Sequence, residues 1–308
     1  MRVLILVLIG LTCFCPFSRA AVPQSNEPII LNLTVSTKKG TIIRGLTPED
    51  LSITVDKQPL KILSLDEREV PASIGILIDT SGSQDVRGTV EITRQFKQGL
   101  TRFFELNNPA NEYFALAFNT KPELVQDWTS DYQSILAKFD SLKFGKPTSL
   151  YDALRISLEK MKTSRNSKRV LVLISDGADN QSKASFKEVR DLLKASDVVL
   201  YSVGLLNVVG IGDVATIPVT EGDGVLKELT GLSGGRVLFM NTSQGAEAFN
   251  EVFELIALEL RSQYQVAIVP EPSSGSAKWR KLKVMASRTS STGQKEELLA
   301  RTRQGYYR

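Results

Sequence analysis

The sequence predicts an α/β fold, a doubly wound and mostly parallel sheet inserted in a small β-sandwich-like domain. Two observations predict it. Between Ala72 and Arg261, short apolar runs alternate with amphipathic helical patterns, as in a parallel sheet covered by helices. On either side of this stretch only strand patterns occur. Each flank is under about 50 residues, too short to bury a stable core alone, so we expect the N- and C-terminal segments to pair.

The chain begins with the pattern of a secretory signal peptide. Met1-Arg2 precedes an apolar run from Val3 to Phe17, and Ser18-Arg19-Ala20 supplies small residues for cleavage. This predicts a secreted, periplasmic or cell-surface protein, with retention of the leader as an anchor left open. The run is shorter than the roughly 20 residues that a membrane span needs, so we expect no transmembrane segment in the mature chain. The predicted organisation is a signal peptide at 1–20, a first half of the β domain at 24–70, an α/β domain at 71–262 and a second half of the β domain at 263–308.

The composition excludes several kinds of chemistry. The chain contains no histidine, which rules out a Ser-His-Asp triad and histidine-bound zinc. Both cysteines, Cys13 and Cys15, lie in the leader, so the mature chain has no disulfide or thiolate site. The formal net charge is +4, and removing Arg2 and Arg19 with the leader leaves +2. So small an excess predicts no nucleic-acid partner.

The flanking strands are predicted from short alternating runs separated by turn residues. Turn signals such as Lys38-Lys39-Gly40 and Asp56-Lys57-Gln58-Pro59 separate the first runs. The loose segment Pro270 to Ala277 separates later ones. The predicted strands are 29–35, 41–43, 51–55 and 60–65 before the α/β stretch, and 264–269, 279–286 and 297–307 after it.

The α/β elements follow from apolar periodicity. Continuous β-branched runs such as 74–78 and 169–174 predict strands buried on both faces. Apolar residues at helical spacing predict helices, and Ser130 and Asp131 are suited to cap one of them. The predicted strands are 74–78, 113–118, 123–128, 169–174, 198–204 and 236–239, and the predicted helices are 86–106, 130–139, 150–161, 186–193, 224–232 and 246–261.

Polar residues follow the first buried strand directly. The run Ile74 to Ile78 ends in Asp79-Thr80-Ser81-Gly82-Ser83, with a carboxylate and hydroxyls at a strand end. In open α/β sheets, ligands bind beyond the carboxyl ends of the strands. Carboxylate and hydroxyl oxygens are donors that Mg²⁺ prefers, in near-octahedral geometry at about 2.1 Å.

Two further segments reach the same edge. Asp176 follows the predicted strand 169–174 in the turn Ser175-Asp176-Gly177, and Thr148 lies in a loop that enters a helix. The predicted metal ligands are Asp79, Ser81, Ser83, Thr148 and Asp176. They would surround one cation and leave at least one coordination position open. Hard oxygen ligands suit both Mg²⁺ and Mn²⁺.

This pattern resembles a known family. Asp79-x-Ser81-x-Ser83 with the distant Thr148 and Asp176 is similar to the metal-ion-dependent adhesion site of von Willebrand factor type A domains, over roughly residues 72–262. The resemblance implies a Rossmann-like fold and a non-enzymatic protein. It also implies that a Glu or Asp side chain of a protein partner completes the coordination of the metal, and that this contact serves adhesion or assembly. Pro147 departs from the glycine more often found before the threonine.

The flanks carry a second resemblance. Gly45-Leu46-Thr47-Pro48-Glu49-Asp50, Lys278-Trp279-Arg280-Lys281 and Gly305-Tyr306-Tyr307 are similar to segments of secreted, von Willebrand type A-related bacterial proteins of Acidobacteria. The identity of the partner and the oligomeric state are not predicted.

The same residues allow other interpretations. Asp79, Ser81 and Ser83 alone would suit a helix N-cap, and Asp152 and Asp179 are interpreted as capping or solvated acids. A Mg²⁺-dependent hydrolase or phosphotransferase using Asp79 is the enzyme alternative, disfavoured because Ser81 stands where the haloacid-dehalogenase pattern needs a second aspartate. A structural module with the metal as a staple is the third hypothesis.

Three more segments have competing interpretations. Gly210-Ile211-Gly212-Asp213 has the spacing of a dinucleotide-binding motif, which must open a helix directly after a strand. Because no helix is predicted before about Gly224, residues 208–223 are predicted to form a flexible loop. This loop either lies on the ligand-binding rim or is a surface insertion. The basic and aromatic run 278–283 is interpreted as an edge strand. Helix 246–261 presents a core face, and a relay along it from Asp79 to Tyr264 is a further hypothesis.

Overall fold

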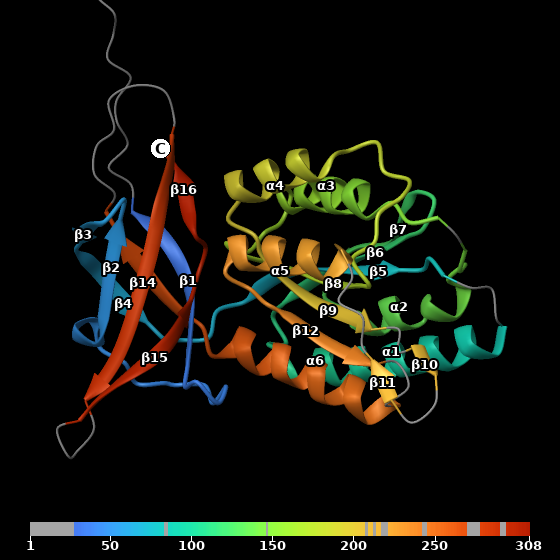
Figure 1. Ribbon diagram of the computed structural model, residues 1–308, viewed down its shortest axis with the longest axis horizontal. Helices are drawn as coiled ribbons and strands as arrows, with labels where there is room; N and C mark the ends of the chain where they lie inside the picture. Colours follow the sequence, from blue (N-terminus) through green and yellow to red (C-terminus); the bar gives the residue numbers. More distant parts are fainter. Residues whose placement is uncertain are drawn as a thin grey trace, which may run out of the picture.

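The computed structural model describes residues 28–82, 86–145, 147–206, 209–211, 214–216, 221–241, 245–269, 278–289 and 294–308. The predicted signal peptide with Cys13 and Cys15, and the predicted ligand Ser83, lie outside these residues. The described chain forms two parts, each with its own main sheet (Figure 1). One part has helices on both faces of its sheet and the other consists of strands, which confirms the predicted fold class.

The sheet of the α/β part has six strands. They are ordered β12-β9-β8-β5-β6-β7, and every pair is parallel except β6 with β7. The central strand β5 is buried along its whole length, and Ile74, Ile76 and Ile78 are fully inaccessible to solvent. The strands are β5 (Ala72–Asp79), β6 (Glu112–Phe118), β7 (Pro122–Thr129), β8 (Lys168–Ser175), β9 (Val199–Leu206) and β12 (Val237–Asn241).

Helices cover both faces of this sheet because each carries an apolar stripe (Figure 1). On one face lie α1 (Val86–Leu106), α2 (Tyr132–Leu136), the short 3₁₀ helix η2 (Phe139–Ser141) and α6 (Ala246–Arg261), which share a core with the sheet. On the other face lie α3 (Leu150–Met161), α4 (Phe186–Ala195) and α5 (Glu221–Ser233). The first helix packs along the last one through Phe96 and Phe249, whose ring centroids are 5.1 Å apart.

The β part is assembled from both ends of the described chain. Its strands follow the order β3-β2-β14-β15-β1-β13-β4, with β16 paired to β14, so N- and C-terminal strands are interleaved. Leu33, Tyr264 and Leu282 come from three of these strands and share one core. The strands are β1 (Ile29–Ser36), β2 (Leu51–Val55), β3 (Gln58–Leu60), β4 (Ile62–Asp66), β13 (Tyr264–Ile268), β14 (Trp279–Thr289), β15 (Lys295–Arg301) and β16 (Gly305–Tyr307), with a 3₁₀ turn η1 at Pro48–Asp50.

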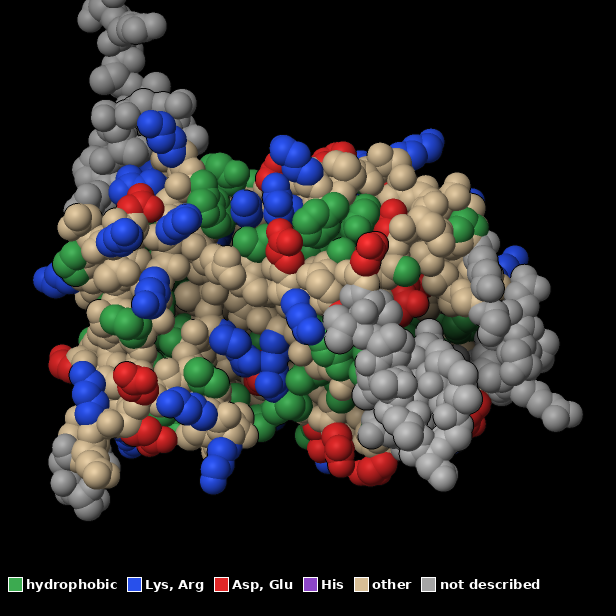
Figure 2. All heavy atoms as spheres, viewed as in Figure 1, with side chains coloured by type: hydrophobic (Ala, Val, Ile, Leu, Met, Phe, Trp, Pro, Cys, Tyr) green, Lys and Arg blue, Asp and Glu red, His purple; other side chains and the backbone are tan. Residues whose placement is uncertain are grey.

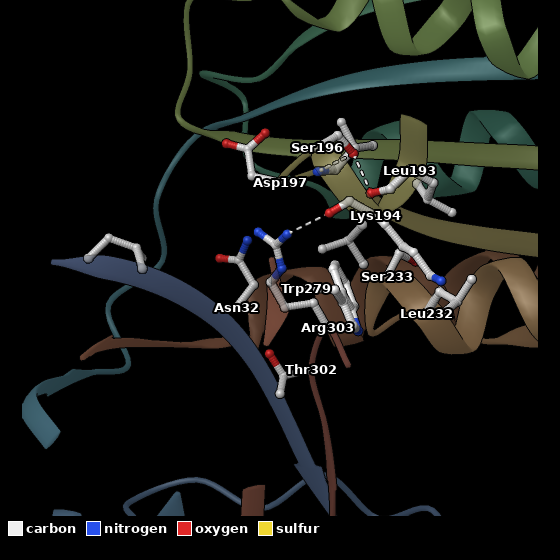
Figure 3. A pocket seen from close by; sticks show the side chains of 13 residues that line it. Asn32, Leu193, Lys194, Ser196, Asp197, Leu232, Ser233, Trp279, Thr302 and Arg303 are labelled. Atoms are coloured by element: carbon white, nitrogen blue, oxygen red, sulfur yellow. Dashed lines mark hydrogen bonds between the residues drawn. The ribbon is translucent and has the colours of Figure 1, made fainter. Parts of the chain in front are cut away.

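The two parts meet in a closely packed junction (Figure 3). The Arg303 guanidinium donates a hydrogen bond to the Lys194 carbonyl at the end of α4, at 3.1 Å. The Gln304 amide donates to the Leu232 carbonyl in α5, at 3.0 Å. The cavity that remains here is about 10 Å³, which is room for about one water molecule. The C-terminal segment therefore anchors the β part to two helices of the α/β part.

The structure differs from the sequence prediction in four segments. Residues 208–223 contain a small hairpin, β10 (Val209–Ile211) paired with β11 (Val214–Thr216), and α5 begins at Glu221. The strand predicted at 297–307 is two strands separated at 302–304, where the chain packs against α5. The 41–43 segment makes only one isolated bridge, Ser36 with Ile42. The 130–139 helix is the short α2 followed by η2.

Charge is spread over the surface in the view of Figure 2. Lysine and arginine side chains cover the strand-rich part and the junction, interspersed with Asp and Glu. Among the described residues, no helix combines the length and the apolar character that crossing a bilayer requires.

Candidate metal site at the carboxyl edge of the sheet

Asp79 is the last residue of β5, and its side chain is held in place before any ligand binds. The residue is only 6% exposed. Its Oδ2 accepts a hydrogen bond from the Ser175 hydroxyl at 2.7 Å, and its Oδ1 accepts one from the Ser81 amide at 2.9 Å. Burial raises the pKa of Asp79 to about 6, and the hydrogen bonds from Ser81 and Ser175 act in the opposite direction. A buried carboxylate of this kind is stabilised by a bound cation.

Asp176 lies one residue beyond the position opposite Asp79, because β5 and β8 are parallel neighbours in register with Ile78 opposite Ile174. One Asp176 oxygen accepts the Ala178 amide at 3.0 Å, which fixes the turn. Burial is the main cause of the raised pKa of Asp79, and the negative charge of Asp176 adds to it. A divalent cation would balance both.

Gly177 allows the turn after Asp176 to adopt its conformation. Its φ is +81°, and a Cβ atom there would lie 2.4 Å from the Gly222 carbonyl oxygen at the start of α5. Its amide donates to the Ser175 hydroxyl at 3.0 Å, the same hydroxyl that donates to Asp79. The Ser175–Gly177 turn therefore connects both acidic residues to α5.

Thr148 is brought to the same edge by hydrogen bonds across two loops. Its amide donates to the Asn180 side chain at 2.8 Å, and its carbonyl accepts the amides of Asn180 and Gln181 at 3.0 Å. Thr148 is 5% exposed and lies two residues before the start of α3 at Leu150. The turn that follows Asp176 thus fixes the position of the loop that carries Thr148.

The predicted donor set fits a hard divalent cation. Two carboxylates and two hydroxyl residues, Asp79, Asp176, Ser81 and Thr148, lie on loops tied to one another at the ends of β5 and β8. Within the described part of the chain, no three His, Cys, Asp or Glu side chains form a group that could hold a metal ion. Oxygen donors of this kind suit Mg²⁺ and Mn²⁺.

The two nearby acids have structural roles, as predicted for capping residues. The Asp152 carboxylate accepts the amides of Lys183 and Ala184, both at 3.0 Å. Asp179 accepts the Tyr151 amide at 3.2 Å and the Ser182 hydroxyl at 2.5 Å. Both carboxylates therefore join the 179–184 loop to the first turn of α3.

Sequence reasoning missed the residues that support the site. Ser175 holds Asp79, and Asn180 holds Thr148. Asn119 donates to the Thr80 hydroxyl at 3.3 Å and to the Lys143 carbonyl at 3.0 Å, which fixes the strand end against the next loop. The position of Ser175 directly before Asp176 was a signal, whereas the contacts of Asn119 and Asn180 depend on loop conformations that no local pattern specifies.

Comparison with known proteins supports the fold of the α/β part. Residues 74–178 match the family model described as von Willebrand factor type A domain. A comparison with curated proteins finds no match.

Solved structures with a similar fold include a von Willebrand factor type A protein from Catenulispora acidiphila, at 12% identity and a TM-score of 0.49, with 83% of this chain and 73% of that chain covered. BatB from Bacteroides thetaiotaomicron has 14% identity and a TM-score of 0.44, with 62% of this chain and 100% of that chain covered. The vWF domain of the type V pili tip protein Mfa5 from Porphyromonas gingivalis has 10% identity and a TM-score of 0.45, with 67% of this chain and 99% of that chain covered. The matched residues 74–178 lie within the α/β part and run from β5 to the turn after β8.

Proposed function

We propose that this chain is an extracytoplasmic protein-binding module that captures an acidic side chain of a partner through Mg²⁺ or Mn²⁺. The metal would be held by Asp79, Ser81, Ser83, Thr148 and Asp176. When bound, the cation supplies an electrophilic position that a Glu or Asp of the partner completes. The predicted leader at 1–20 supports export, and the resemblance to secreted proteins of Acidobacteria stays a prediction.

The observation that carries the proposal is the buried Asp79 carboxylate beside Asp176. An ionised carboxylate that is 6% exposed and has a second carboxylate nearby is costly in the absence of a cation. The surrounding hydrogen bonds from Ser175 and Ser81 orient Asp79 instead of neutralising its charge. This arrangement is expected of a site that is stabilised when a metal binds.

The same geometry disfavours catalysis at Asp79. Both carboxylate oxygens already accept hydrogen bonds, and the side chain is buried, which hinders attack on a substrate. A hydrolase would also need a positioned general base, and the chain has no histidine to serve as one. A binding function therefore fits the described residues better than the phosphotransferase alternative.

Calorimetry on EDTA-treated mature protein tests the metal site. We expect saturable binding of Mg²⁺ and Mn²⁺ to the wild type, and loss of binding in Asp79→Ala and Asp176→Ala. The matched control is Asp131→Asn, which removes one negative charge at the exposed N-cap of α2, where asparagine caps equally well. Circular dichroism of each variant establishes folding, and absence of binding to the folded wild type would refute the proposal.

A further inference from the structure

A groove lies beside the candidate metal site, on the side of the β6–β7 hairpin. Its volume is about 340 Å³, and we call it the lysine groove. One wall is formed by Asn119, Lys121 and Leu124 of the hairpin, and the other by Lys138 and Lys143 on the segment after α2, with Thr80 at its inner end. The 49% exposure of Leu124 leaves an apolar surface for the stem of a bound side chain.

The lysine groove shares its inner wall with the metal site. Thr80 lies between Asp79 and Ser81, and its carbonyl accepts the Gly145 amide at 2.9 Å. Gly145 is three residues before Thr148, a span of at most about 11 Å of chain. An extended partner segment of three or four residues is therefore long enough to reach from the metal into the groove.

The charges lining the groove are mainly positive. Lys121, Lys138 and Lys143 face a single acid, Glu123. The Lys121–Glu123 pair is 3.2 Å long with both side chains well exposed, so its net contribution is small and a partner carboxylate can compete for the lysine. The neighbouring Asp140 is paired with Lys97 at 2.9 Å and does not neutralise the groove.

The lysines are presented on fixed backbone. Lys138 donates one of its three N–H bonds to the Val125 carbonyl at 2.9 Å, which joins the two walls. Asn119 holds the Lys143 carbonyl at 3.0 Å, while within the described residues the Lys143 ammonium makes no ion pair. The Lys138 ammonium and the backbone of Lys143 are therefore held in place before a partner arrives, which lowers the cost of binding.

From this continuity and charge we propose that the lysine groove is a second recognition subsite for an acidic, extended segment of the partner protein. The inference rests on the function proposed above. The metal would bind one Glu or Asp of the segment, and the groove would bind a second acidic side chain two to four residues away. A partner with an isolated acidic residue would lack this second contact and would bind more weakly.

An array of capped glycine-serine peptides tests the subsite. Each peptide carries one glutamate at a fixed position. One set has no other acidic residue, and in the other set a single aspartate is placed at each remaining position in turn. Binding is measured in Mg²⁺ and in EDTA. We expect a Mg²⁺-dependent signal that strengthens about three- to tenfold when the aspartate lies two to four residues from the glutamate, as one or two exposed charge pairs would give. The gain should fade in high salt.

Variants separate this inference from the metal site itself. Lys121→Gln with Lys143→Gln should abolish the gain from the second acid while leaving Mg²⁺ calorimetry and single-glutamate binding unchanged. Lys39→Gln with Lys283→Gln makes the same change in charge on the exposed surface of the β part and should retain the gain. The subsite is refuted, and the metal-dependent function is not, if single-glutamate peptides bind in Mg²⁺ but the aspartate adds no affinity. The same holds if the affinity gained from the aspartate is retained in the Lys121→Gln, Lys143→Gln variant. If Mg²⁺ binds but no peptide shows a Mg²⁺-dependent signal, the acidic-partner function fails with it.

Discussion

Replacing Glu259 with glutamine should weaken the attachment between the two parts of the molecule. Glu259 lies on α6, is 1% exposed, and contacts Arg236 at 2.5 Å and Arg301 at 2.8 Å. Arg236 belongs to the α/β part, whereas Arg301 ends β15 of the β part. The carboxylate therefore links the last helix to both sheets.

The expected magnitude follows from burial. Removing one partner of a buried ion pair typically costs about 3–5 kcal/mol, because the remaining charge stays desolvated. Here the arginine side chains keep 24% and 27% of their exposure, so water can compensate them in part. Burial also lowers the pKa of Arg236, which shows that its charge is already costly. We expect Glu259→Gln to lower the free energy of unfolding by about 2–4 kcal/mol.

The two tryptophans provide one reporter for each part. Trp128 lies on β7 and Trp279 on β14, so Trp128→Phe and Trp279→Phe backgrounds report the two parts separately in urea unfolding followed by fluorescence. Glu259→Gln should lower the midpoint seen by both reporters. The control Glu254→Gln, on the same helix as Glu259, breaks an exposed pair with Arg102 of α1 and should change the free energy of unfolding by less than about 1 kcal/mol. A Glu259→Gln variant as stable as this control would refute the reasoning.

Three further predictions concern buried polar groups. The pKa of Asp79 is about 6 in the folded state against an ordinary value of 3.8, so its contribution to stability is present at low pH and is lost as the pH rises through about 6. Asp79→Asn, measured in EDTA at neutral pH, should therefore raise the free energy of urea unfolding by up to about 3 kcal/mol. A variant of equal or lower stability would contradict this. Burial lowers the pKa of Lys168 to about 8, so its contribution to stability is present above about pH 10.5 and is lost as the pH falls through 8. Between pH 8 and 10, the free energy of unfolding should rise by up to about 3 kcal/mol more in the wild type than in Lys168→Met. Parallel curves for the two proteins would contradict the lowered pKa. The Ser157 hydroxyl is buried in α3 without a hydrogen-bond partner among the described residues. Ser157→Ala should therefore raise the thermal midpoint, with a gain of about 1 kcal/mol in the free energy of unfolding. A lower midpoint would indicate that the hydroxyl has a hydrogen-bond partner.

Elements with strong periodicity could be predicted from the sequence almost to the residue. The bounds of α1 and α6 agree with the predicted 86–106 and 246–261, because both helices bury a continuous apolar stripe. The pairing of the terminal strands was also predictable, since neither flank could form a core alone. The small hairpin β10–β11 was missed because three-residue strands lie below the length at which alternation can be recognised.

The candidate site was predictable only as far as local motifs extend. Asp79 and Asp176 follow buried strands, and parallel neighbours place their ends together. The contact of Asn119 with Lys143 joins residues 24 positions apart through loop backbone, which no periodicity encodes. The break at 302–304 arises from packing of the C-terminal segment on the end of α5, a tertiary contact that overrides strand propensity.

The most direct test of the central claim is a crystal structure of the mature protein soaked with Mn²⁺, read by anomalous scattering. The account predicts one peak between Asp79 and Asp176, with oxygen ligands from Ser81, Ser83 and Thr148 and a water molecule in the position that a partner carboxylate would take. A peak elsewhere, or none at this edge of the sheet, would contradict the metal site. A sphere completed entirely by side chains of this chain would show that the metal is a structural staple and not a point of attachment for a partner.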